Sequence, residues 1–330
     1  MACIYNYSLS TGELPRDWRL AYVTPIFKQG SRTNPANYRP VSLTSIFYKV
    51  LEHIVLHNMQ ECLNELSVYQ HGFRKHMSCT TQLACVTHDL RNNFDRIIPT
   101  HAAVLDFSKA FDIVPHNKLI QKLVGCNVNP LLVRWISSFL SNRFQQVIAK
   151  RCKSKPAAVT SGVPQGSVLG PALFSVFIND IVNSVKYCNI RLFADDTILY
   201  TEVTKTRDAH KLQHDLNMLH IWSLDNGMRY NATNSNVIIF GNNESLIRYD
   251  YILGGVPLKQ GKSIKYLKIY LTSNLKRDMH IEYTTQKAMK VLGLIKYPLH
   301  DAPEKNQTFG IQHTMQTYIR VRIRGLGSFI

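Results

Sequence analysis

The stretch NIRLFADDTILY, from Asn189 to Tyr200, places two adjacent aspartates, Asp195 and Asp196, between two apolar segments. Apolar runs separated by a short polar centre predict two β-strands joined by a tight turn. Aspartate is common in turns because its side chain hydrogen-bonds to nearby backbone groups, so on its own the pair is most often structural. The alternative is that the two carboxylates are directed at metal ions.

Two other segments favour the metal-binding alternative. The short apolar run AAVLDF contains Asp106, and an aspartate at the end of a buried strand is costly unless it is paired. If this strand and the hairpin lie in one sheet, three carboxylates meet at its edge, where their oxygens suit Mg²⁺. Two such ions about 4 Å apart form the clamp used for in-line phosphoryl transfer. The segment SGVPQGSVLGP adds Gly162 and Gly166, which permit close backbone approach, and Gln165 as a polar contact.

The composition indicates a polyanionic partner. The 330 residues carry a formal net charge of +17, which favours nucleic acid first and an anionic membrane surface second. There is no run of 18 apolar residues and no signal-peptide pattern, so we expect no membrane span. The seven cysteines include no CxxC pair, and neither they nor His53 and His57 match a zinc pattern. We therefore expect a reducing, intracellular compartment.

The periodicity of apolar residues predicts helices and strands without a regular βαβ repeat, which indicates an α+β fold with a mixed or antiparallel sheet. No GxGxxG, GxxxxGK[ST] or GxSxG motif occurs, so dinucleotide-binding, P-loop and hydrolase folds lack their signatures. Helices are predicted at residues 43–66, 80–94, 118–124, 130–140, 168–182 and 208–227, and strands at 102–107, 145–150, 157–162, 190–200 as a hairpin, 236–240 and 264–271.

Three of these segments resemble the catalytic motifs of reverse transcriptases of non-LTR (LINE-type) retrotransposons. LDFSKAFD (Leu105–Asp112), SGVPQGSVLGP (Ser161–Pro171) and FADD (Phe193–Asp196) are similar to motifs A, B and C of that family. Upstream, LPRDWRLAYVTPIFKQGSRTNPANYRPVSLTS and QHGFRKHMSCTTQL resemble the family's fingers, in the same order. The similarity covers nearly the whole chain and is strongest over residues 14–225.

The resemblance implies a right-hand polymerase architecture. Fingers are expected over residues 1–95, a palm with a mainly antiparallel sheet backed by helices over 96–275, and a partial thumb over 276–330. The implied activity is that of an RNA-directed DNA polymerase, which extends a DNA primer on an RNA template with dNTPs. The implied cofactor is a pair of Mg²⁺ ions, which Mn²⁺ can replace. The resemblance also implies action in the nucleus and a chain that is a fragment of a longer polyprotein; no oligomeric state is indicated.

The resemblance further assigns roles to single residues. Phe111 stands where the family has the aromatic ring that excludes a 2′-hydroxyl, with an ordinary core phenylalanine as the alternative. Lys28 and Arg39 are implied to contact the triphosphate, with a basic surface loop as the alternative. For Arg74 the alternative is a structural role. The implied metal ligands are Asp106, Asp195, Asp196 and the backbone of Phe107; the dNTP contacts are Phe111, Gln165, Gly166, Lys28 and Arg39; the primer or template contacts are Arg74, Tyr266 and Leu267.

The sequence departs from the family at several positions. Asn234 stands where the family has a lysine that protonates pyrophosphate, and Lys268 and His76 replace glycines. The family pattern is lost towards RVRIRGLGSFI at the C-terminus, which predicts a truncated thumb. These departures predict a slower enzyme; the alternative is a catalytically weak or inactive relic that retains nucleic-acid binding. A nucleotide cyclase, another palm-fold enzyme, is disfavoured by the fingers motifs and Gln165.

Overall fold

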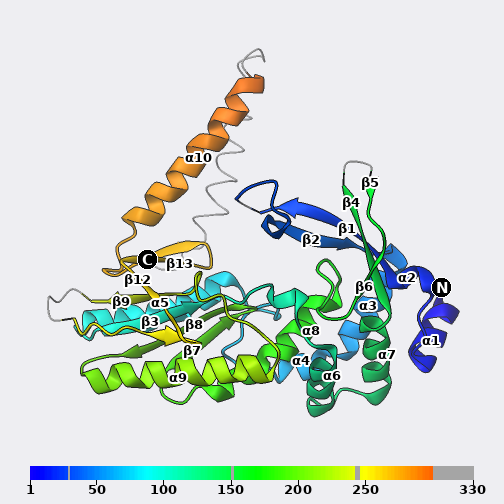
Figure 1. Cartoon of the computed structure of the whole chain (residues 1–330), viewed down its shortest axis with the longest axis horizontal. Coiled ribbons are helices and arrows are strands. Elements are labelled where there is room, and N and C mark those ends of the chain that lie inside the picture. The colour runs from blue at the N-terminus through cyan, green and yellow to red at the C-terminus, as the bar shows by residue number, and fades with distance from the viewer. Residues whose placement is uncertain (29, 150–151, 242–245, 300–330) are drawn as a thin grey trace. The chain divides into compact units, whose positions relative to one another are not determined.

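The computed structural model describes residues 1–28, 30–149, 152–241 and 246–299, and the chain forms two compact units (Figure 1). Each unit is built from segments that are distant in the sequence, and the division passes through the motif LDFSKAFD. The predicted division into fingers, palm and thumb stays a prediction, and the predicted thumb truncation falls outside the described residues. Of the described residues, the first unit contains those of Met1–Lys75, Phe107–Val185 and Met218–Tyr230; the second contains those of His76–Asp106, Lys186–Asn217 and from Asn231 to Leu299.

The first unit contains a mixed sheet with the strand order β2-β1-β4-β5, and β6 also pairs with β4. Strands β1 and β4 run parallel, whereas the other pairs are antiparallel. The predicted pairing between residues 145–150 and 157–162 is confirmed, because Gln145 of β4 lies opposite Ala157 of β6. The strands are β1 Leu20–Phe27, β2 Tyr38–Leu43, β4 Arg143–Ala149, β5 Cys152–Lys153 and β6 Ala157–Val159.

The helices of the first unit enclose an aromatic core. Trp135 and Phe139 of α7 stack with their ring centroids 5.7 Å apart, and Tyr48 of α3 lies 5.7 Å from Phe139. The predicted helix at 43–66 is present as two helices, because the helical conformation is interrupted at Met59. The helices are α1 Ala2–Thr11, α2 Arg16–Arg19, α3 Ile46–Asn58, α4 Gln60–Asn64, α6 His116–Gly125, α7 Pro130–Leu140 and α8 Leu169–Ile178, with 3₁₀ turns at Pro35–Asn37, Ala110–Asp112 and Asn179–Ser184.

The second unit is built on a five-stranded sheet with the order β12-β9-β3-β8-β7. Strand β12 is parallel to β9 and all other neighbours are antiparallel, so the predicted mixed sheet is confirmed. Two small hairpins, β10-β11 and β13-β14, accompany it. The elements are α5 Cys79–Asp95, β3 Thr100–Leu105, β7 Asn189–Phe193, β8 Asp196–Glu202, β9 Asn236–Phe240, β10 Ile252–Leu253, β11 Val256–Pro257, β12 Lys259–Gly261, β13 Ser263–Tyr266, β14 Ile269–Thr272 and α10 Asp278–Leu299.

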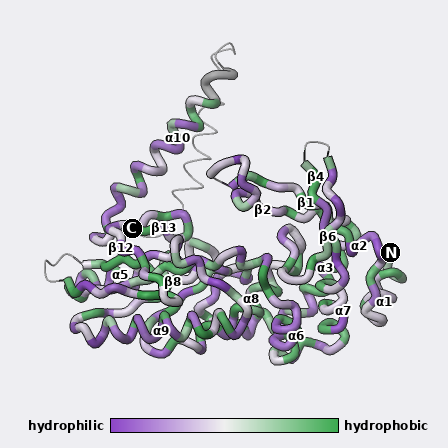
Figure 2. Tube along the Cα trace, viewed as in Figure 1, coloured by the Kyte–Doolittle hydropathy of each residue, from purple (hydrophilic) through white to green (hydrophobic). Residues whose placement is uncertain are grey.

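Both faces of this sheet are covered. On one face, apolar residues of β3, β8 and β9 form a core with α5 and the β13-β14 hairpin, in which Tyr200 and Tyr266 are almost completely buried. On the other face, His101 bonds to the hydroxyl of Tyr251 at 2.7 Å. Helix α9 (Thr206–Asp225) is joined to β10 by two hydrogen bonds between the Gln213 side chain and the Ile252 backbone. Figure 2 shows α9 as a mixture of hydrophobic and hydrophilic residues, as expected of a helix with one apolar face.

None of the helices within the described residues is both long and apolar enough to cross a bilayer.

The β13-β14 hairpin closes through a turn that strains two side-chain-bearing residues. Tyr266 lies opposite Ile269, which leaves Leu267 and Lys268 as the turn, and their φ angles are +44° and +70°. Positive φ at both central residues is the geometry of a type I′ turn, which favours glycine or asparagine. The turn therefore forms with a lysine at residue 268, at a cost in backbone strain.

We predict that Lys268→Gly stabilises the second unit by about 1 kcal/mol, because glycine adopts positive φ without steric cost. The measurements are the urea unfolding midpoint and amide-exchange protection over residues 263–272. The matched control is Lys262→Gly, since Lys262 is exposed and has no positive φ. Equal effects of the two substitutions would show that turn strain at residue 268 does not limit stability.

Candidate active site

The three aspartates singled out in the sequence lie on neighbouring strands of one sheet. Leu105, the last residue of β3, is paired with Thr197 of β8, so Asp106 follows β3 at the register position of Asp196. Phe193 pairs with Asp196 across the β7-β8 hairpin, which leaves Ala194 and Asp195 as its turn. The predicted strand–turn–strand is therefore confirmed, and so is the expectation that the Asp106 strand shares its sheet.

The turn itself has an unusual backbone. Ala194 has a φ of +55°, a left-handed conformation that costs a residue with a Cβ about 1–2 kcal/mol. This short turn holds Asp195 next to Asp196 at the same end of the sheet as Asp106. Asp106 and Asp195 are half-buried and Asp196 is exposed, so water and solutes can reach the group.

The donor set fits a hard divalent cation, since carboxylate oxygens are the ligands that Mg²⁺ prefers. Within the described residues, however, no three His, Cys, Asp or Glu side chains are gathered as a ready-made metal-binding group. One carboxylate is engaged elsewhere: Asn234 Nδ2 donates a hydrogen bond to Asp106 Oδ2 at 3.0 Å. The backbone therefore brings the three residues together, while the Asp106 side chain is held by a residue that the sequence analysis marked only as a departure.

The electrostatic influence of Asp196 extends to a neighbouring thiol. Burial raises the pKa of Cys79, the nearby Lys268 ammonium opposes this shift, and the Asp196 carboxylate adds to it. Lys268 and Asp196 therefore act on the same part of the second unit with opposite charge.

In the first unit, the chain after Asp106 is fixed by an aromatic stack. Phe107 is buried and lies parallel to Tyr230, with ring centroids 4.1 Å apart. The two residues also form an isolated antiparallel β-bridge, and Ser108 N–H donates to the carbonyl of Arg229 at 2.8 Å. The Phe107 backbone is thus anchored by hydrogen bonds as well as by its ring.

Phe111 packs in an aromatic cluster of the first unit. Its ring stacks on Phe174 of α8 at a centroid distance of 4.3 Å and meets the edge of Phe73 at 6.1 Å. Phe174 is completely buried, whereas Phe111 is half-buried and Phe73 is exposed. Phe111 therefore has one packed side, as a core residue has, and is still partly accessible.

The glycine-containing segment after Ser161 is bound to the residues around Phe111. Val163 N–H donates to the Phe111 carbonyl and Gly162 N–H to the Val114 carbonyl, both at 2.8 Å. Gly162 has a φ of +87°, and a Cβ there would lie 2.6 Å from the Asp112 carbonyl oxygen. The predicted close backbone approach is thus observed, and it is to the chain itself.

Gln165 is hydrogen-bonded through both its side chain and its backbone. Its side-chain amide donates to Asp112 Oδ1 at 2.8 Å, and its carbonyl accepts from Ser42 N–H of β2 at 2.7 Å. Burial raises the pKa of the Asp112 carboxyl, and the hydrogen bond from Gln165 opposes that shift. The next residue, Gly166, has a φ of +100°, and a Cβ there would lie 2.7 Å from the Ser42 carbonyl oxygen.

Sequence reasoning missed two carboxylates that position this segment. Asp112 lies within the quoted motif LDFSKAFD, and Glu52 lies on the buried face of α3. Glu52 Oε2 accepts hydrogen bonds from Val168 and Leu169 N–H at 2.7 and 3.0 Å, which caps the start of α8. Burial raises the pKa of the Glu52 carboxyl, and the hydrogen bonds from Leu169 and Val168 oppose that shift. An acidic residue among the apolar positions of the predicted helix was the available signal.

A polar cavity of about 310 Å³ adjoins Gln165 in the first unit. Its walls come from β1, β2, β4 and the segment around Gly162. Its lining includes charged and polar side chains, among them those of Lys109, Asp112, Arg143 and Gln165. Cationic and amide side chains in such a cavity can bind an anionic or hydrogen-bonding group of a small ligand.

The remaining predicted contacts fall into two groups. Lys28 follows β1 and Arg39 lies on β2 opposite Ile26, so the hairpin register places both cations on one face, and both are exposed. Arg74, by contrast, donates to the backbone carbonyls of Ser67, Gln70 and Asn64 at 2.6–3.3 Å. These three bonds favour the structural alternative for Arg74.

The side chains of Tyr266 and Leu267 in the β13-β14 hairpin are packed against the protein. The ring of Tyr266 is buried, and its hydroxyl accepts a hydrogen bond from Gln82 Nε2 of α5 at 2.9 Å. Leu267 packs partly against the core below the sheet. A primer contact at this hairpin would therefore involve the turn backbone.

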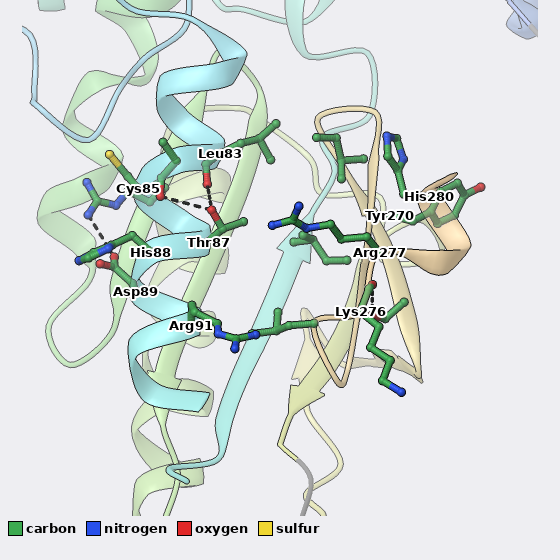
Figure 3. A pocket seen from close by; sticks show the side chains of 16 residues that line it. Leu83, Cys85, Thr87, His88, Asp89, Arg91, Tyr270, Lys276, Arg277 and His280 are labelled. Atoms are coloured by element: carbon green, nitrogen blue, oxygen red, sulfur yellow. Dashed lines mark hydrogen bonds and ion pairs between the residues drawn. The ribbon is translucent and has the colours of Figure 1, made fainter. Parts of the chain in front are cut away.

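A second, larger cavity of about 800 Å³ lies between α5 and the β13-β14 hairpin (Figure 3). Figure 3 shows Thr87 and Arg91 of α5 extending toward the side of the cavity where Tyr270 and Arg277 lie. At its border Asp89 pairs with Arg191 at 3.3 Å and accepts the hydroxyl of Tyr200. None of the three aspartates lines this cavity, so it is distinct from the candidate site.

Comparison with known proteins identifies the family. The model of the family described as "Reverse transcriptase (RNA-dependent DNA polymerase)" matches residues 26–295. The chain is 29% identical over 313 residues to a probable RNA-directed DNA polymerase from transposon BS of Drosophila melanogaster, covering 91% of this chain and 34% of that protein. It is 30% identical over 293 residues to the RNA-directed DNA polymerase from mobile element jockey of the same species, covering 85% and 32%. The chain thus spans about a third of the length of these curated relatives.

Solved structures share the fold at low sequence identity. Apo telomerase from Candida tropicalis, truncated from its C-terminal domain, matches with a TM-score of 0.56 and 12% identity, covering 83% of this chain and 57% of that chain. Telomerase from Candida albicans in complex with a TWJ fragment of telomeric RNA matches with a TM-score of 0.53 and 12% identity, covering 98% and 58%. The family model covers most of the described chain, and the sequence resemblance to non-LTR retrotransposon enzymes is confirmed: this chain belongs to the reverse transcriptase (RNA-dependent DNA polymerase) family.

Proposed function

We propose that this chain is an RNA-directed DNA polymerase that adds dNTPs to the 3′-hydroxyl of a primer. The observation that carries the proposal is the meeting of Asp106, Asp195 and Asp196 at one end of a paired β3-β8 ladder in a chain of this family. Carboxylates that are brought together in this way repel one another, and a bound cation removes that cost.

Members of the reverse transcriptase family generally use divalent metal ions, and we assign two Mg²⁺ ions, with Mn²⁺ as a substitute, to the three aspartates and the Phe107 backbone. When bound, such ions acidify an attacking hydroxyl and neutralise charge on phosphate oxygens. The contribution of the chain is rigidity: the paired strands fix Asp106 and Asp196, and the turn fixes Asp195.

We assign the incoming dNTP to Phe111, Gln165 and Gly166, with Lys28 and Arg39 as contacts of the triphosphate. The polar cavity beside Gln165 and the partly accessible Phe111 ring support this assignment. Lys28 and Arg39 share one exposed hairpin face, and cations on such a face suit a polyphosphate.

We assign an RNA template and a DNA primer as the macromolecular partners. The net charge of +17 supports a polyanionic partner, and the Candida albicans telomerase was solved with an RNA fragment. The backbone at Tyr266 and Leu267 is the proposed primer contact, and Arg74 is left with its structural role. Action inside the cell, in the nucleus, rests on the family resemblance alone.

We predict that Asp195→Ala lowers primer extension at least roughly 100-fold, because one carboxylate of the metal-binding group is lost. Incorporation of dNTPs with Mg²⁺ is measured on RNA and DNA templates. The matched control is Asp250→Ala, which removes an exposed carboxylate of the same unit.

Three outcomes are distinct. Loss in Asp195→Ala alone supports the polymerase. Equal incorporation by Asp195→Ala and the parent chain would show that Asp195 is not part of the active site. Absence of incorporation by the parent chain, with salt-sensitive nucleic-acid binding retained, would favour the inactive relic that Asn234 and Lys268 also allow.

We predict that Phe111→Val lowers discrimination against rNTPs by roughly 10-fold or more, the size of effect that one change in pocket shape produces. Relative kcat/KM for dNTPs and rNTPs is the measurement. Phe144→Val is the control, because Phe144 is an exposed phenylalanine of the same unit and lies on strand β4, where valine is well tolerated. Unchanged sugar selectivity in Phe111→Val would make Phe111 an ordinary packing residue.

A further inference from the structure

The segment Asn231–Ser235, which we call the Asp106 loop, is hydrogen-bonded to Asp106, the residue that follows β3. It lies immediately before β9, and β9 is paired with β3 through Asn236 and Val104. The loop is therefore fixed to the same ladder that carries Asp106. Its own backbone is closed by bonds from the N–H groups of Asn234 and Ser235 to the Asn231 carbonyl at 3.1 and 2.9 Å.

The Asp106 loop binds both backbone polar groups of Asp106. Asn231 N–H donates to the Asp106 carbonyl at 2.7 Å, and Asp106 N–H donates to Ser235 Oγ at 3.1 Å. Ser235 is completely buried, and its hydroxyl proton goes to the Asn231 carbonyl at 2.9 Å. The main chain at Asp106 is hydrogen-bonded at both its N–H and its carbonyl, so it has little freedom to rotate.

The third contact reaches the Asp106 side chain. Asn234 Nδ2 donates to Asp106 Oδ2 at 3.0 Å, and the two residues are 128 positions apart in the sequence. With the backbone already fixed, one hydrogen bond to a carboxylate oxygen is sufficient to restrict rotation of its short side chain. The Asp106 loop thus restricts the orientation of the carboxylate.

We propose that Asn234 is a positioning residue that holds the Asp106 carboxylate ready for a divalent cation. The proposal rests on the function assigned above to the three aspartates. The sequence does not suggest this role for Asn234. The resemblance implied only that an asparagine stands where the family has a lysine that donates a proton. Hydrogen-bond partners of metal ligands typically change metal affinity 10- to 100-fold when they are removed.

The chemistry of the amide explains why a neutral donor suits this place. A lysine ammonium at the same distance would neutralise Asp106 and compete with a metal ion for its charge. The asparagine amide supplies the hydrogen bond and leaves the full negative charge on the carboxylate. Asn234 can therefore orient Asp106 without adding a positive charge beside it.

The test uses Mn²⁺ binding by the full chain without substrates, measured by the loss of the free Mn²⁺ signal in electron paramagnetic resonance. We expect Asn234→Ala to weaken Mn²⁺ binding roughly 10-fold and Asn234→Lys to weaken it at least as much, because a cation then faces Asp106. Thr233→Ala is the matched control: the Thr233 hydroxyl bonds to Asn231 Oδ1 at 2.7 Å, in the same loop. It should bind Mn²⁺ like the parent chain.

A second readout separates positioning from stability. In primer extension, the Mg²⁺ concentration for half-maximal rate should rise roughly 10-fold in Asn234→Ala, while saturating Mg²⁺ restores kcat and leaves the KM for dNTP unchanged. A loop that was merely destabilised would lose rate at all Mg²⁺ concentrations, and that result would overturn the proposal.

Asp106→Asn separates this inference from the proposed function. If Asp106→Asn loses Mn²⁺ binding and Asn234→Ala does not, the aspartate assignment stands and the role of Asn234 is refuted. If Asp106→Asn binds Mn²⁺ like the parent chain, the metal assignment itself is wrong, and the role of Asn234 falls with it.

Discussion

The antiparallel pairing of β3 with β8 is the constraint on which the candidate site depends. Its register sets Leu105 opposite Thr197, and a shift of one residue would turn the side chains of the strand to the opposite face of the sheet. The pairing is stabilised from both sides, because α5 and the β13-β14 hairpin bury Ala102 and Tyr200 on one face while His101 is buried on the other. Correct placement of Asp106 beside Asp196 therefore follows from the packing of the whole second unit.

Much of this arrangement could be predicted from local sequence. The hairpin from Asn189 to Tyr200 follows from alternating apolar runs and a two-residue turn, and helix α7 begins at Pro130, as predicted, because Asn129 caps it. The interruption at Met59 was not predictable in this way, since residues on both sides keep apolar helical spacing. Neither was the division of the chain into two units, which depends on contacts between distant segments.

In the candidate site, too, contacts between distant segments could not be predicted from the sequence. The three aspartates and Gln165 were identified because their motifs are contiguous in the sequence. The residues that hold them were not, because Asn234 lies 128 positions from Asp106 and Glu52 lies 116 positions from Val168. The spacing of apolar residues predicts helices and strands, but it does not predict a hydrogen bond between two distant segments. Asp112 was visible as part of its motif, yet its bond to Gln165 was not.

The departures from the family pattern have different physical consequences. Lys268 sits in a turn that still closes, so its cost is backbone strain of about 1–2 kcal/mol and not loss of the hairpin. Asn234 changes the chemistry instead, because an amide can orient Asp106 and cannot donate a proton to a leaving group. The Asp106 loop provides a partner for the N–H, the carbonyl and the carboxylate of Asp106, so this carboxylate is oriented by a residue that carries no ammonium group.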